Sequence, residues 1–152
     1  MAKVGRASRN ASLMRIETIT ADKTIESAES GEVYLLGTAN TAVTLPALKE
    51  GAYFKFIVSA TIENHATLLR IVSPNGKMEG LATVEKTGGG TDTVLVHSTV
   101  ASHLVFKVTS SASSSNGVFA GSTVEIYCDG TNWHVQANIA HKGTVTTAFA
   151  AS

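Results

Sequence analysis

The feature that most constrains this chain is a succession of short β-forming segments with no helical period between them. The segments are rich in valine, isoleucine, threonine and aromatic residues. Glycine, proline, asparagine and serine separate them at intervals of about 8–12 residues. In no window do apolar residues recur every 3.6 residues, as they would on an amphipathic helix. The pattern predicts an all-β domain, built as a single antiparallel β-sandwich or a barrel-like fold.

The expected strands occupy most of the chain between residues 32 and 137. They lie at residues 32–36, 41–45, 52–59, 68–72, 78–84, 93–97, 103–108, 123–128 and 131–137. A chain of 152 residues is the usual size of one domain. We therefore divide it into a basic N-terminal arm (residues 1–16), a β-rich body (residues 17–137) and a C-terminal arm (residues 138–152), where the sequence becomes small, polar and rich in alanine.

The last two segments are predicted to form a β-hairpin that is closed by Asp129 and Gly130. An Asp-Gly pair between two β-rich segments favours a two-residue type I′ turn. The register that follows opposes Ile126 to Trp133, Val124 to Val135, and Glu125 to His134. This register gives the hairpin one apolar face and one charged face. Asp129, Gly130 and Trp133 are therefore its expected structural residues.

The composition argues against several classes of protein. Only 16% of the residues are charged, against about 25% in an average soluble protein. Twelve basic residues balance twelve acidic ones, whereas a nucleic-acid-binding domain would be strongly basic. No apolar segment reaches the 18 or so residues of a membrane span, and the single cysteine, Cys128, excludes an internal disulfide. Such low charge suits a protein that buries part of its surface in an assembly.

Positive charge is concentrated in the first sixteen residues. Four cations and no acid lie there, namely Lys3, Arg6, Arg9 and Arg15. Two interpretations of this arm remain open. A solvated terminus needs no partner. An arm that docks instead requires a surface with acidic groups, and with apolar contacts for Val4 and Met14.

No motif in the sequence predicts catalysis. The five histidines lack the i, i+4 spacing of a helical metal site. The glycines at 88–90 are followed by another β-forming segment, and not by the Gly-Lys-Ser/Thr and helix of a phosphate-binding loop. We therefore expect no enzyme, no metal, no cofactor and no small-molecule substrate.

Two segments resemble a β-rich module of tailed-phage virion proteins. The first reads VTLPA at residues 43–47 and GAYFKFIV at residues 51–58, and the second reads VEIYCDGTNWHV at residues 124–135. Similar modules occur in head-decoration (cement) proteins and in tail-fibre domains, and they are commonly trimeric. The resemblance implies a virion structural protein and a homotrimer. It assigns no functional residue, because the matching residues are those that build the fold.

The surroundings of the module favour a capsid decoration protein over a tail fibre. A fibre usually has a long shaft of heptads or repeats, and this sequence has neither. We expect a protein on the outer surface of the phage head that stabilises contacts between capsomers. Its partner would be the major capsid protein, contacted by the arm residues Lys3, Arg6, Arg9 and Arg15, with no nucleic acid or membrane involved. The alternatives are a short tail-fibre, spike or receptor-binding subunit, and a carbohydrate-binding β-sandwich.

Overall fold

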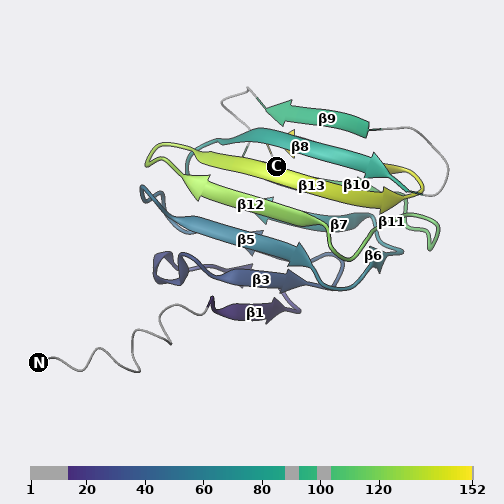
Figure 1. The fold of residues 1–152 in the computed structure, drawn as a ribbon, viewed down its shortest axis with the longest axis horizontal. Helices are drawn as coiled ribbons and strands as arrows, with labels where there is room; N and C mark the ends of the chain where they lie inside the picture. The colour runs from purple at the N-terminus through teal and green to yellow at the C-terminus, as the bar shows by residue number, and fades with distance from the viewer. Residues whose placement is uncertain (1–13, 88–92, 99–103, 152) are drawn as a thin grey trace, which may run out of the picture.

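A computed structural model describes residues 14–87, 93–98 and 104–151 of the chain. These residues form two β-sheets that pack face to face around one hydrophobic core (Figure 1). The larger sheet contains nine of the described strands and the smaller sheet contains five. The all-β, sandwich-like architecture predicted from the sequence is therefore confirmed.

The larger sheet is built around one long strand, β13 (Trp133–Lys142). On one side of β13 the order is β12 (Thr123–Cys128), β5 (Tyr53–Val58), β3 (Val33–Leu36) and β1 (Ile16–Ile19). On the other side lie β8 (Met78–Lys86) and β9 (Thr93–Ser98). The far end of β13 pairs with β11 (Gly117–Val118), which pairs in turn with β6 (Ile62–Glu63).

The smaller sheet covers the inner face of the larger one. Its order is β14 (Val145–Ala150), β10 (Val105–Ser110), β7 (Thr67–Val72), β4 (Ala42–Thr44) and β2 (Lys23–Thr24). A single 3₁₀ turn, η1 (Ser27–Glu29), is the one helical element of the described residues.

Both sheets are mixed, so the purely antiparallel arrangement expected from the sequence is wrong. In the larger sheet β1, β3 and β5 run parallel to one another, and β8 runs parallel to β13. In the smaller sheet β2, β4 and β7 are parallel. For the pairs among β1 to β5, the cause is the path of the chain, which alternates between the two sheets over these strands. Two successive crossings bring the chain back to the same sheet, and the new strand runs in the same direction as its neighbour. Parallel neighbours need such crossover connections.

The core is aromatic, and the side chains of β5 alternate between half-buried and buried. Phe54 and Phe56 point inward and are at most 1% exposed. The Phe56 ring stacks on Tyr34 at 5.4 Å, and the Phe54 ring lies 6.0 Å from Trp133. Inward residues of the smaller sheet belong to the same cluster, which shows that one core holds the two sheets together.

The final hairpin forms, but its register differs from the predicted one by two residues. Cys128 lies opposite Trp133, and Ile126 lies opposite Val135. His134 therefore faces Tyr127 rather than Glu125. Because side chains alternate with a period of two, an even shift keeps Trp133 on the inner face, where it is 0% exposed.

A four-residue loop closes the hairpin in place of the predicted type I′ turn. The Oδ1 atom of Asp129 accepts hydrogen bonds from the backbone N–H groups of Thr131 and Asn132, each at 2.7 Å. An aspartate side chain that bonds the backbone two residues on stabilises a turn of its own. This carboxylate explains why the loop is longer than the Asp-Gly pair alone suggests. Gly130 does adopt a positive φ, of 94°.

The expected C-terminal arm is instead part of the sandwich. Strand β13 continues to Lys142, and β14 pairs with β10 in the smaller sheet. Phe149 is 7% exposed, and its ring lies 5.2 Å from Phe106. The composition misled the prediction because small residues also fit closely packed strands. Residues 1–13 of the N-terminal arm, with Lys3, Arg6 and Arg9, lie outside the described residues.

Replacing Trp133 should test the hairpin assignment. Trp133→Ala removes a fully buried side chain and should lower the free energy of unfolding by about 3–5 kcal/mol. His134→Ala is the matched control on the outer face of the same strand, and it should cost about 1 kcal/mol or less. Urea unfolding of both variants measures the difference. A larger loss in His134→Ala would mean that the faces of β13 are reversed.

Candidate functional site

An exposed apolar strand edge lies where the chain enters the fold. Strand β1 is the last strand at this side of the larger sheet (Figure 1). Among the described residues, β1 pairs only with β3. Met14 and Ile16 are 56% and 65% exposed, although large apolar side chains are usually covered. We call Met14, Ile16 and the unpaired backbone of β1 the β1 edge. Such an edge can pair with or pack against another chain.

Arg15 holds the β1 edge to the body of the protein. Its guanidinium lies 2.8 Å from the carboxylate of Glu32, whose side chain is only 6% exposed. Its backbone oxygen accepts a hydrogen bond of 2.8 Å from Val33. An arginine beside a buried carboxylate supplies the counter-charge that the carboxylate needs. Arg15 therefore pairs within the fold, and it is the one predicted arm cation among the described residues.

Three carboxylates gather beneath the β1 edge. Oxygen atoms of Glu17, Glu29 and Glu32 all lie within 4.8 Å of one another. Carboxylate oxygens are ligands for hard divalent cations. Here, however, the ammonium of Lys23 lies 2.6 Å from Glu17 and 2.8 Å from Glu29. The chain thus supplies its own cation. We call Lys23 with these three glutamates the acidic cluster.

The cluster also joins the two sheets. Glu17 belongs to β1 of the larger sheet, and Lys23 belongs to β2 of the smaller one. The Lys23 ammonium lies 5.3 Å from the centroid of the buried Tyr34 ring, within the range of a cation–π contact. These contacts tie the edges of both sheets to the aromatic core.

The charges of the cluster shift the pKa values of its members. Burial by itself would lower the pKa of Lys23 and raise that of Glu29. The hydrogen bonds that the two carboxylates accept from Lys23 outweigh burial, so the pKa of Lys23 is raised. The pKa of Glu29 is lowered by the Glu26 N–H and by Lys23. Burial, followed by the negative charge of Glu29, raises the pKa of Tyr34.

A second group of side chains lies on the outer face of the larger sheet. The register aligns Tyr53, Tyr127, His134 and Glu79 in one row across four strands. Tyr127 is 52% exposed, and its ring stacks on His134 at 5.0 Å. The sequence did not reveal the neighbours that complete this row.

The predicted hairpin residues take two different positions. Asp129 reaches the outer row, where its Oδ2 atom lies 2.8 Å from Nε2 of His134. The hydrogen bond with His134, together with those from the Asn132 and Thr131 N–H groups, lowers the pKa of Asp129. Trp133 is in the core on the inner face. The hairpin and the β1 edge are separated by β3 and β5, so the predicted residues do not form one site.

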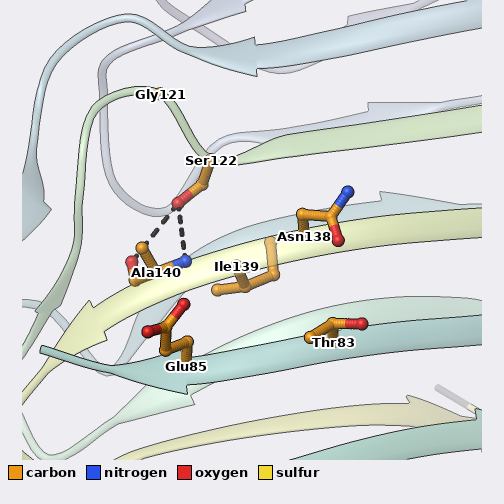
Figure 2. Close-up of a pocket in the computed structure, with 7 residues that line it drawn as sticks. All are labelled: Thr83, Glu85, Gly121, Ser122, Asn138, Ile139 and Ala140. Atoms are coloured by element: carbon orange, nitrogen blue, oxygen red, sulfur yellow. Dashed lines mark hydrogen bonds between the residues drawn. The ribbon is translucent and has the colours of Figure 1, made fainter. Parts of the chain in front are cut away.

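A shallow cleft of about 170 Å³ opens where β13 changes its partner (Figure 2). Strand β12 pairs with β13 as far as Asn138, and β11 takes over at His141. Between them, Ser122 Oγ accepts a hydrogen bond of 3.0 Å from the Ala140 N–H. The lining residues are Thr83, Glu85, Gly121, Ser122, Asn138, Ile139 and Ala140. The cleft offers one carboxylate among neutral polar groups, and the strand exchange is enough to explain it.

No protein family, curated protein or solved structure matches the chain. Within residues 14–87, 93–98 and 104–151, no helix is long and apolar enough to cross a membrane.

Removing the ammonium from the acidic cluster should destabilise the protein. Lys23→Met leaves Glu17 and Glu29 without their cation, and it should lower the free energy of unfolding by about 1–3 kcal/mol at neutral pH. Lys55→Met is the matched control. It breaks a more exposed ion pair with Glu125 and should cost about 0–1 kcal/mol. Urea unfolding of both variants measures these losses.

The loss in Lys23→Met should shrink in acid. The lowered pKa of Glu29 contributes stability above its unfolded value of 4.5, and that contribution disappears as the pH falls through the folded pKa. Protonated carboxylates no longer need the ammonium, so the variant should approach the wild type below about pH 4.5. A loss that is independent of pH would show that Lys23 contributes packing rather than charge.

Proposed function

We propose that this protein is a structural subunit of a tailed-phage virion, which decorates the outer surface of the head by binding the major capsid protein. The observation that supports this most directly is the β1 edge. An exposed, apolar strand edge directly follows a segment with three cations and no acid. Proteins usually protect such edges. A neighbouring subunit on the virion would cover this one.

The charge distribution defines what the partner surface must offer. Residues 1–13 carry Lys3, Arg6 and Arg9 without an acid, which leaves nine basic and twelve acidic residues in positions 14–152. A segment of this charge binds acidic groups. Met14 and Ile16 add the need for apolar contacts. We therefore assign attachment to residues 1–13 together with the β1 edge, and we leave Arg15 in its internal ion pair.

A receptor-binding subunit of the tail is the second candidate. It is favoured by Tyr127, since exposed aromatic side chains with a polar end are enriched at binding surfaces. A carbohydrate-binding sandwich would use the same row. Trp133 and Tyr34 are fully buried, so such a surface could use neither of them. We rank this candidate below decoration because it rests on one exposed aromatic side chain and gives no role to the β1 edge or to the cations of residues 1–13.

Attachment should depend on the N-terminal segment and on the β1 edge. Deleting residues 1–13 should leave the melting temperature unchanged and weaken co-sedimentation with undecorated heads. The double variant Met14→Ser/Ile16→Ser should weaken it as well. Only the full-length protein and the double variant should lose further binding as salt is added, because salt screens exposed charges. Co-sedimentation over a salt series measures both effects.

Leu81→Ser is the matched control for the apolar contribution. Leu81 is 44% exposed on β8, on the other side of β13, and its replacement should leave binding unchanged. Full-strength binding by the truncated protein and by the double variant would reject this attachment surface. Weakened binding by Leu81→Ser alone would move it to the β8 side of the sheet.

Imaging of labelled particles should separate the two candidates. A decoration protein gives many evenly spaced copies over the head, and we propose that they are grouped as homotrimers. A reconstruction of the particle shows both the position and the grouping. A few copies at one vertex would favour the tail candidate, and isolated single copies would reject the trimer.

A further inference from the structure

The chain contains two Asn-Gly pairs, and the structure places them in opposite environments. Asn75 and Gly76 lie in the turn between β7 and β8, whereas Asn116 and Gly117 lie at the start of β11. An asparagine followed by glycine is the pair most open to cyclisation, because glycine has no side chain to hinder its own backbone nitrogen. Whether it cyclises depends on how firmly the side-chain amide and that nitrogen are held.

The Asn75 amide is free to move. Asn75 is exposed. Within the described residues neither its side chain nor the Gly76 N–H takes part in a hydrogen bond. The hydroxyl of Ser73 donates instead to the two backbone oxygens of this pair, at Asn75 and Gly76. The turn is thus held through its carbonyl groups, while neither of the two groups that would react is held by a hydrogen bond.

The Asn116 amide is held on both sides. Asn116 is 7% exposed. Its Nδ2 group donates to the backbone oxygen and to the hydroxyl of Ser111, at 3.1 and 2.7 Å. Its Oδ1 atom accepts a hydrogen bond of 2.8 Å from the Thr144 N–H. Gly117 is also paired in β11. Cyclisation there would require these bonds to break first.

We propose that Asn75 is a site of spontaneous deamidation in the folded protein and that Asn116 is protected. In the first step the Gly76 nitrogen bonds to Cγ of Asn75, the Cγ–Nδ2 bond breaks, and ammonia leaves with the proton of the Gly76 N–H. The product is a cyclic succinimide. Water then adds to one of its two carbonyl carbons and opens the ring, which leaves an aspartate or an isoaspartate. The net change consumes one water and releases one ammonia.

The modification would act on a tightly packed turn. A Cβ atom on Gly76 would lie 2.8 Å from the Thr131 backbone oxygen and from a methyl of Leu48, so this turn packs directly on the loop of the last hairpin. The next residue, Lys77, accepts a hydrogen bond of 2.9 Å from the Trp133 N–H. An isoaspartate lengthens the backbone by one methylene here, and either product adds a negative charge beside Lys77.

Peptide mapping of the aged, folded protein tests this proposal. After incubation in mildly alkaline buffer, mass spectrometry should locate the exchange of an amide NH₂ for OH at Asn75. The deamidation rate at Asn75 should exceed that at Asn116 by at least about tenfold. This ratio corresponds to a difference of about 1.4 kcal/mol between the two activation free energies. In urea-unfolded protein the two sites should react at similar rates, because the hydrogen bonds of Asn116 are lost.

Asn75→Gln is the control, because glutamine cyclises far more slowly. This variant should keep the fold and lose the modification, together with the isoaspartate that a protein isoaspartate methyltransferase labels. Equal rates at the two sites in the folded protein would overturn the proposal. So would an Asn75 that stays intact in the folded protein while it reacts in urea.

Discussion

The alternation of the chain between the two sheets is the constraint on which the rest of the structure depends. From β1 to β5 the chain passes to the other sheet after each strand, so neighbouring strands of this segment within one sheet run parallel. None of these strands is joined to its neighbour by a short hairpin. Each sheet edge must then be fixed by other contacts. The acidic cluster provides these at one edge, since Lys23 on the smaller sheet bonds Glu17 on the larger one. The same crossing leaves β1 at the margin with exposed Met14 and Ile16.

The internal ion pairs change the meaning of the charge pattern. In the sequence, Arg15 is grouped with Lys3, Arg6 and Arg9 as one basic arm. In the structure, Arg15, whose side chain is 79% exposed, forms an ion pair with the buried Glu32. Removing one member of such a pair leaves a buried charge without compensation. Arg15 therefore has a partner within the fold, and the proposed attachment through charge rests on the three cations that precede Met14 in the sequence.

The sequence was sufficient for local features and insufficient for pairing. Period-two alternation correctly gave the last hairpin an inner face with Trp133 and Val135, because the alternation of side chains is a property of each strand. Strand direction depends on partners far along the chain, so the parallel pairs were missed. Asp129 shows the same limit at a turn, since its side chain bonds the Thr131 and Asn132 N–H groups and moves the register by two residues. The acidic cluster could not be found either, because its four residues come from β1, β2, η1 and the loop before β3.

The position of β14 has a consequence for how the protein acquires its fold during synthesis. This strand forms one edge of the smaller sheet, pairs along its whole length with β10, and adds Phe149 to the core. On the ribosome, the residues of β14 emerge after those of every other described strand. Until they do, one side of β10 remains unpaired and Phe106 lacks its aromatic neighbour. Completion of the smaller sheet is therefore a late event, and chains that end prematurely would expose a strand edge that quality-control proteases and chaperones can recognise.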